Sequence, residues 1–113
     1  MTTLEGAGGS DRLYGGDVDD RLFGRFGNDL MNGGRDNDEL EGGRGDDTMY
    51  GADGDDKITG GYGSDKLYGG RGNDIIRSSW TGADTIDCGP GRDIVYKRAG
   101  IRARNCEHVR RLG

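Results

Sequence analysis

A nine-residue repeat runs through most of this chain and constrains its fold more than any other feature. Residues 60–68 and 69–77 both follow the pattern G-G-x-G-x-D-x-U-x, in which U is a large aliphatic residue. Units of the same length tile residues 6–77 without a gap. We interpret Ser78 as one inserted residue, after which two degraded units cover residues 79–96. A fixed short period predicts a solenoid, in which each repeat packs against its neighbours.

Two positions of the repeat carry the same type of residue in all ten units. The sixth position is always aspartate: Asp11, Asp20, Asp29, Asp38, Asp47, Asp56, Asp65, Asp74, Asp84 and Asp93. The eighth is always aliphatic: Leu13, Leu22, Met31, Leu40, Met49, Ile58, Leu67, Ile76, Ile86 and Val95. A disordered, glycine-rich acidic segment has no reason to keep an aliphatic residue at every ninth position. We therefore expect residues 6–96 to be folded.

Each unit divides into a turn and a very short strand. Glycines in the first half permit the positive φ angles and close backbone approach that a tight turn requires. The last three residues alternate polar, aliphatic and polar, which predicts a strand with one inward side chain. Two turns and two strands form a coil of about eighteen residues, and stacked coils give two facing parallel sheets. We expect an all-β fold, no membrane span and no enzyme activity, because the sequence contains no catalytic constellation.

The pattern resembles the RTX, or haemolysin-type, calcium-binding repeat family, whose members form a parallel β-roll. The resemblance covers residues 6–96 and implies that this region is a calcium-binding β-roll. Residues 1–5 are then an N-terminal extension, and residues 97–113 a basic C-terminal cap with Ile101 and Val109 as apolar contacts. The resemblance also implies that neighbouring calcium sites share an aspartate.

The residues themselves also favour a metal. Ten aliphatic side chains bury little apolar surface for a chain of this length, whose ordering costs about 1–2 kcal/mol per residue. Carboxylates stacked at the strand spacing of about 4.8 Å repel one another. Ca²⁺ suits such sites because it accepts six to eight oxygen ligands in irregular geometry. Turns on one edge belong to alternate units, so each calcium site should lie between two neighbouring aspartates of one edge, and eight sites are the maximum. The pairs are Asp11/Asp29, Asp29/Asp47, Asp47/Asp65 and Asp65/Asp84 on one edge, and Asp20/Asp38, Asp38/Asp56, Asp56/Asp74 and Asp74/Asp93 on the other.

The resemblance further implies that backbone carbonyl groups complete each coordination shell. The expected donors are the second- and fourth-position glycines: Gly9, Gly16, Gly27, Gly34, Gly43, Gly45, Gly54, Gly61, Gly63, Gly70, Gly72, Gly82, Gly89 and Gly91. Some units depart from the pattern. Val18 and Asp36 replace the fourth-position glycine of units two and four, and a β-branched Val fits poorly where φ must be positive. We expect the Asp20/Asp38 site to be weak and the sites of units five to eight to be the best formed.

The two cysteines predict a cross-link near the C-terminus. Cys88 and Cys106 lie 18 residues apart, which is one full coil, so their Cα atoms should be about 5 Å apart. A zinc site is the alternative, but two cysteines and the lone His108 fall one ligand short. A disulfide implies an oxidising compartment. We therefore expect a secreted or cell-surface location, with the export signal outside this chain.

Taken together, the sequence predicts a calcium-binding module that becomes a rigid β-roll on binding Ca²⁺ outside the cell. One alternative is a calcium-dependent assembly or adhesion element that self-associates through its N-terminal coil edge. Another is the C-terminal repeat domain of a larger secreted hydrolase or toxin. Residues 97–113 carry six Lys or Arg residues against Glu107 alone. Because the rest of the chain is acidic, we expect a cap there rather than a nucleic-acid-binding segment.

Overall fold

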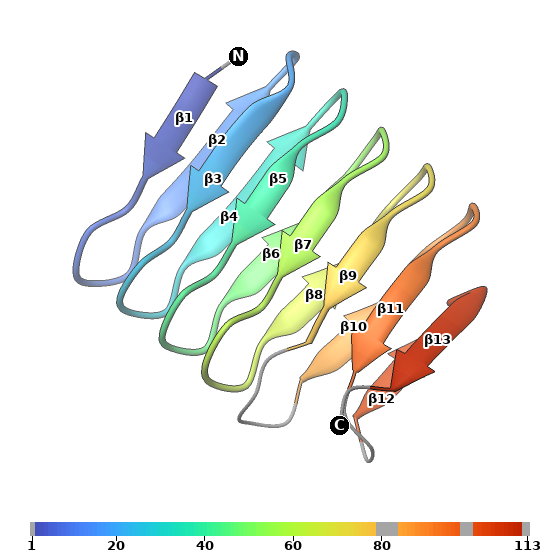
Figure 1. Ribbon diagram of the computed structural model, residues 1–113. Coiled ribbons are helices and arrows are strands. Elements are labelled where there is room, and N and C mark those ends of the chain that lie inside the picture. Colours follow the sequence, from blue (N-terminus) through green and yellow to red (C-terminus); the bar gives the residue numbers. More distant parts are fainter. Residues whose placement is uncertain (1, 79–83, 98–100, 112–113) are drawn as a thin grey trace.

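The structure is a computed structural model that describes residues 2–78, 84–97 and 101–111. In these ranges the chain forms two parallel β-sheets and no helix, as Figure 1 shows. One sheet contains β1 (Thr2–Glu5), β3 (Asp20–Phe23), β5 (Glu39–Glu41), β7 (Lys57–Thr59), β9 (Ile75–Arg77), β11 (Ile94–Lys97) and β13 (His108–Arg111). The other contains β2 (Arg12–Gly16), β4 (Leu30–Gly34), β6 (Thr48–Tyr50), β8 (Lys66–Tyr68), β10 (Thr85–Asp87) and β12 (Arg102–Arg104). The predicted all-β parallel solenoid is confirmed.

The register of the sheets follows from the repeat. Each strand pairs with the strand two further along the chain, so that Leu40 lies beside Ile58 and Met49 beside Leu67. These partners are eighteen residues apart, as expected for a coil of two units. Successive turns of one kind therefore stack along one edge of the roll (Figure 1). We call the edge with Asp11, Asp29, Asp47, Asp65 and Asp84 the first edge, and that with Asp20, Asp38, Asp56, Asp74 and Asp93 the second edge.

The core is a single file of eighth-position side chains between the sheets. From Leu22 to Val95 all nine of these residues are buried, with exposures of at most 1%. Leu13 belongs to the first coil and is half-buried. Cys88 and Ile101 extend the core toward the C-terminus. The alternation of polar and aliphatic residues thus predicted the core correctly, because the middle residue of each three-residue strand points inward.

Ser78 is not an insertion between two units. Its N–H donates to the carbonyl of Tyr96 at 2.9 Å, just as the first-position N–H groups of Gly60 and Gly69 donate to Arg77 and Asp87. Ser78 therefore occupies the first position of the ninth unit, and our prediction that this unit starts at the next residue was wrong. The extra residue falls within 79–83, which lies outside the described residues.

Both sheets extend beyond the nonamer units. β1 pairs with β3 at one end, and β12 and β13 pair with β10 and β11 at the other. Ile101 packs into the core, as expected of the C-terminal segment. Val109 does not, because its strand is the last of its sheet; its side chain is 52% exposed. No helix among the described residues is long and apolar enough to cross a membrane.

The outer faces carry side chains aligned from strand to strand. On the six-stranded sheet, the rings of Tyr50 and Tyr68 stack with their centroids 4.8 Å apart. On the other sheet, Arg21 forms an ion pair with Glu39 at 3.6 Å. These contacts join residues of paired strands and stabilise the sheets by a few tenths to about 1 kcal/mol each.

Candidate metal centre

The repeat places one aspartate at the end of each turn, immediately before each strand from β2 to β11 except β3, of which Asp20 is the first residue. Asp11, in the first coil, is half-buried, and the other nine are at most 4% exposed. The backbone on either side holds them in place. For example, the N–H of Thr48, at the start of β6, donates to the carbonyl of Asp29 at 2.8 Å. The sheet ladder therefore fixes the position of each carboxylate.

One carboxylate oxygen connects adjacent coils in eight of the ten aspartates, those that follow Asp11 and Asp20 on the two edges. The N–H of Asp29 donates to Oδ1 of Asp47, and the N–H of Asp47 donates to Oδ1 of Asp65, both at 2.8 Å. The same bond joins all eight predicted same-edge pairs, at 2.7 to 2.9 Å. The sequence therefore placed these aspartates next to one another correctly.

The second carboxylate oxygen has no such partner along most of the roll. Within the described ranges, Oδ2 is buried and accepts no hydrogen bond in Asp29, Asp38, Asp47, Asp56, Asp65, Asp74 and Asp93. Leaving a buried carboxylate oxygen without a partner is costly, because nothing replaces the water it has lost. Seven such atoms in register are too regular to be packing defects. They are positions where a cation or a proton would compensate the buried charge.

The first-position glycines leave room beside these oxygens. A Cβ atom added to Gly42 would lie 2.6 Å from Oδ2 of Asp47 and 2.4 Å from the carbonyl oxygen of Gly60. At Gly51 the corresponding distances are 2.6 Å to Oδ2 of Asp56 and 2.7 Å to the carbonyl oxygen of Gly69. A carboxylate oxygen and a carbonyl oxygen from the next coil thus converge on six of the eight first-position glycines: Gly6, Gly15, Gly24, Gly42, Gly51 and Gly69. This is the donor set that Ca²⁺ prefers, so the residues fit the ion.

The first-position carbonyl groups were not among our predicted donors. The sequence did contain a signal, because the first position is glycine in every unit from one to eight, whereas the second and fourth positions vary. Glu107 was also missed. His108 pairs with Ile94, so Glu107 lies next to Asp93 in the second-edge ladder.

The predicted second-position carbonyls already accept hydrogen bonds from the next coil. The N–H groups of Arg35 and Tyr62 donate to the carbonyls of Gly16 and Gly43, at 2.7 and 2.8 Å. Fourth-position carbonyls face the next turn: a Cβ atom on Gly45 would lie 2.2 Å from the carbonyl oxygen of Gly27. Gly82 is outside the described residues. The ligand role of these carbonyl groups stays a prediction.

The comparison with protein families matches this same region. The family described as the RTX calcium-binding nonapeptide repeat (4 copies) matches residues 5–40 and 41–76, which together exceed half of the chain. The chain belongs to this RTX family. No curated protein and no solved structure was found to match it. Family and fold together support a calcium-binding repeat module.

The electrostatics of the RTX turns favour a cation or a proton beside the buried carboxyl groups. Burial raises the pKa of Asp47 to about 7 and that of Asp56 to about 9. It likewise raises the pKa of Asp65 and Asp74 to about 8. The N–H from the neighbouring coil lowers each pKa, but the loss of hydration outweighs it, and the next carboxylate of the ladder adds repulsion. Near neutral pH these carboxyl groups therefore hold a proton or need a cation.

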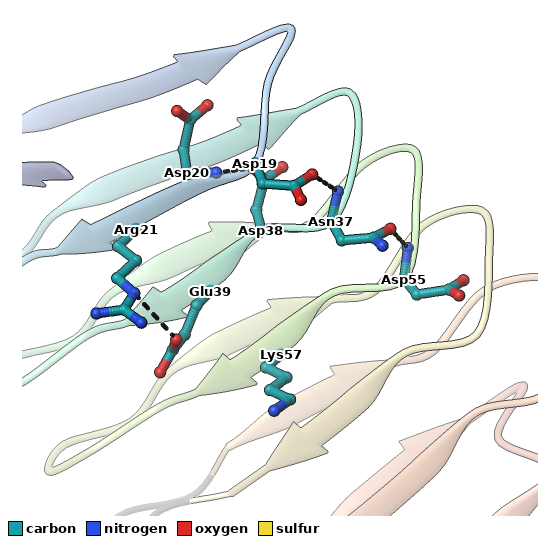
Figure 2. Close-up of a pocket in the computed structure, with 8 residues that line it drawn as sticks. All are labelled: Asp19, Asp20, Arg21, Asn37, Asp38, Glu39, Asp55 and Lys57. Carbon is teal, nitrogen blue, oxygen red and sulfur yellow. Dashed lines mark hydrogen bonds and ion pairs between the residues drawn. The ribbon is translucent and has the colours of Figure 1, made fainter. Parts of the chain in front are cut away.

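A second ladder of side chains stabilises the outer part of the RTX turns. Oδ1 of Asp19 accepts the N–H of Asn37 at 2.9 Å, and Oδ1 of Asn37 accepts the N–H of Asp55 at 2.7 Å (Figure 2). These fifth-position side chains accept from the following coil, whereas the sixth-position aspartates accept from the preceding one. Among the described residues, no group of three or more His, Cys, Asp or Glu side chains is placed to hold a metal. Any calcium site must therefore combine carboxylates with backbone oxygens.

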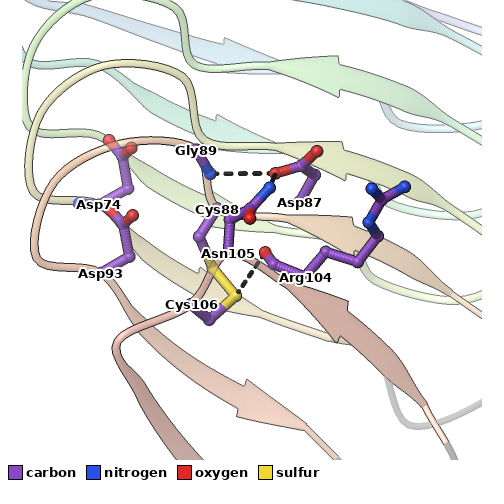
Figure 3. Close-up of a disulfide and its surroundings, with 8 residues drawn as sticks. All are labelled: Asp74, Asp87, Cys88, Gly89, Asp93, Arg104, Asn105 and Cys106. Atoms are coloured by element: carbon purple, nitrogen blue, oxygen red, sulfur yellow. Dashed lines mark hydrogen bonds between the residues drawn. A yellow bond between two sulfur atoms is a disulfide. The ribbon is translucent and has the colours of Figure 1, made fainter.

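The last RTX unit is cross-linked to the following segment. Cys88 and Cys106 form the predicted disulfide, with their Cα atoms 5.1 Å apart (Figure 3). Oδ1 of Asp87 accepts hydrogen bonds from the N–H of Gly89 and from the side-chain amide of Asn105. Because both sulfur atoms are used in the bridge, the alternative of a zinc site formed by these cysteines does not apply.

Proposed function

We propose that this chain is a calcium-dependent folding module, disordered at low calcium and a rigid β-roll when its same-edge turns hold Ca²⁺. The proposed side-chain ligands are the sixth-position aspartates other than Asp84, whose Oδ2 accepts a hydrogen bond from Ser78. The observation that carries the proposal is the row of seven buried Oδ2 atoms without hydrogen-bond partners. Six of them, those of the aspartates from Asp29 to Asp74, lie beside a first-position glycine, in turns otherwise closed by hydrogen bonds, and Asp93 has Cys88 at that position.

Calcium would supply the positive charge that lets neighbouring carboxylates remain ionised at close spacing. The chain's own residues prepare the place for it. In the eight same-edge pairs, Oδ1 of the second aspartate accepts the N–H of the first, so its Oδ2 is held in position before any ion arrives. The first-position glycine keeps side-chain atoms away from it.

The disulfide supports action outside the cell. Disulfides form and persist in oxidising compartments, and Cys88–Cys106 joins the last nonamer to the C-terminal segment. A chain whose buried carboxylates need calcium would stay unfolded where calcium is scarce and fold where it is plentiful. We propose a secreted or surface location on this basis.

Self-association is a second candidate. At the N-terminal end, β1 and β2 each pair on one side only, which leaves backbone donors and acceptors open. The exposed ring of Tyr14 on β2 adds apolar surface there. Size-exclusion chromatography in calcium at several protein concentrations tests this idea. A monomer at every concentration would rule it out and leave calcium binding untouched.

Circular dichroism during a calcium titration tests the main proposal. We expect a coil-like spectrum in chelator and a cooperative gain of β-signal as calcium is added. Magnesium at equal concentration should not replace it, because it demands a stricter octahedral geometry. The same β-signal in excess chelator at neutral pH would refute calcium-dependent folding.

A further inference from the structure

One aspartate of the first edge, Asp84, differs from Asp29, Asp47 and Asp65, which precede it. Oδ2 of Asp84 accepts a hydrogen bond from the hydroxyl of Ser78 at 2.6 Å. Both side chains are buried, at 4% and 5% exposure. In Asp29, Asp47 and Asp65 on the same edge, the corresponding oxygen has no hydrogen-bond partner in the part of the chain that the structure describes.

The difference arises from the first position of the turn. At Gly42 and Gly51, an added Cβ would lie 2.6 Å from Oδ2 of the aspartate in the same turn. Any side chain at this position therefore lies directly beside that oxygen. Ser78 is the first residue in the repeat series to place one there, and its hydroxyl is a hydrogen-bond donor. The hydroxyl supplies the hydrogen-bond donor that the corresponding oxygen of Asp29, Asp47 and Asp65 lacks.

The turn of Gly60, in the coil before Ser78, also differs from the turns of Gly42 and Gly69. An added Cβ on Gly60 would meet Oδ2 of Asp65 at 2.9 Å, and the next atoms, at 3.5 Å, belong to Asp65 and Leu67. At Gly42 and Gly69, by contrast, a carbonyl oxygen of the next coil lies 2.4 and 2.6 Å from that point. The carbonyl group of Ser78 does not converge on Asp65 in this way.

We propose that Ser78 ends the ladder of calcium sites on the first edge, so that the Asp65/Asp84 pair holds no calcium. This inference rests on the proposed calcium-binding function. It leaves three pairs on the first edge and four on the second as candidate sites. On the second edge, Oδ2 of Asp93 keeps no hydrogen-bond partner among the described residues, so that ladder continues to its last nonamer.

Asp84 and Asp93 provide a matched pair for the test, because each is the last nonamer aspartate of its edge. The calcium ions bound per chain are counted by native mass spectrometry and by isothermal titration, using Ca²⁺ alone as the probe. We expect Asp84→Asn to leave the parent count unchanged and Asp93→Asn to lower it by at least one. Asparagine keeps the Oδ1 acceptor in both variants, and circular dichroism in calcium checks that each folds.

Ser78→Gly tests the role of the hydroxyl itself. We expect this variant to bind one more ion than the parent, and the double variant Ser78→Gly/Asp84→Asn to lose that ion again. A count that falls by one in Asp84→Asn, or that stays at the parent value in Ser78→Gly, would overturn the inference. If Ser78→Gly does not fold, Asp84→Asn still decides the question. A parent chain that binds no calcium would instead refute the proposed function itself.

Discussion

Asp47 illustrates how one residue serves two coils. Its N–H donates to Asp65 on one side, and its Oδ1 accepts from Asp29 on the other. Its Oδ2 is buried without a hydrogen-bond partner in the described part of the chain. A neutral side chain here would weaken both sites that share this carboxylate.

Asp47→Asn is therefore expected to lower the calcium count by up to two and to raise the calcium concentration needed for folding. The neighbouring Asp46 provides a charge-matched control, because its carboxylate is exposed and Asn preserves the Oδ1 that accepts the N–H of Ser64. Isothermal titration of both variants beside the parent is the measurement. Equal, small losses of bound calcium in the two variants would show that the buried sixth-position carboxylate is no more important than the exposed fifth-position one.

The backbone conformation at the second position predicts that glycine there is more stabilising than alanine, which two opposite substitutions test. Ala52 adopts a φ of 68°, and Gly43 a φ of 87°. The left-handed conformation costs a non-glycine residue about 1–2 kcal/mol, more than the 0.5–1 kcal/mol of extra chain entropy that glycine loses. Ala52→Gly should thus stabilise the calcium-loaded roll by about 0.5–1 kcal/mol.

Gly43→Ala should destabilise the roll by more than Ala52→Gly stabilises it. Besides the unfavourable φ, its new Cβ would lie 2.4 Å from the carbonyl oxygen of Arg25. Thermal unfolding in saturating calcium compares the two variants with the parent. A lower midpoint for Ala52→Gly would contradict this account of the turn.

At the scale of turns and strands, the aspartate ladders make the calcium-free roll sensitive to pH. The carboxyls of Asp47, Asp56 and Asp65 have pKa values raised to about 7, 9 and 8, against about 3.9 in an unfolded chain. Between about pH 4 and pH 7–9, the folded state therefore binds more protons than the unfolded state. The stability that protonation gives is complete below about pH 4 and is lost as pH rises toward 7–9.

In chelator, lowering the pH from 8 to 5 is accordingly expected to increase the β-signal by circular dichroism. In saturating calcium the dependence should reverse, because protons then compete with the ion for the same oxygens. A calcium-free chain whose β-signal falls on acidification would contradict the pKa shifts described above.

The repeat made the elements predictable but not every detail of the turns. Strand positions, register and core followed from the period, because each unit contains one inward aliphatic residue such as Leu40 or Ile58. The insertion was misplaced because residues 78 and 79 are both serine, and counting alone cannot decide which of them takes the first position. The convergence of first-position carbonyl groups on the carboxylates depends on how each turn folds over its own glycine. The glycine at the first position of units one to eight indicates a close approach there, but not which atoms make it.

The disulfide was predictable for the same reason as the register. Cys88 and Cys106 are separated by one coil, and stacked coils bring their Cα atoms to 5.1 Å. Glu107, by contrast, was not recognised. The segment between β12 and β13 is shorter than a nonamer turn, so only the pairing of His108 with Ile94 shows that Glu107 continues the ladder.

For the whole molecule, the central claim is that a compact roll requires calcium. Among the described residues, at most one aliphatic side chain of each nonamer is fully buried, and the acidic turns repel each other without a cation. The folded chain has a radius of gyration of 12.5 Å over its Cα atoms. An unfolded chain of this length is expected to measure about 34 Å.

Small-angle X-ray scattering at neutral pH, with calcium and then with excess chelator, tests this claim most directly. We predict a radius of gyration close to that of the folded roll in calcium and an expansion toward the unfolded value in chelator, reversed when calcium is restored. The Cys88–Cys106 bridge spans only one coil, so it should limit this expansion little. A chain that stays equally compact in chelator would contradict calcium-dependent folding.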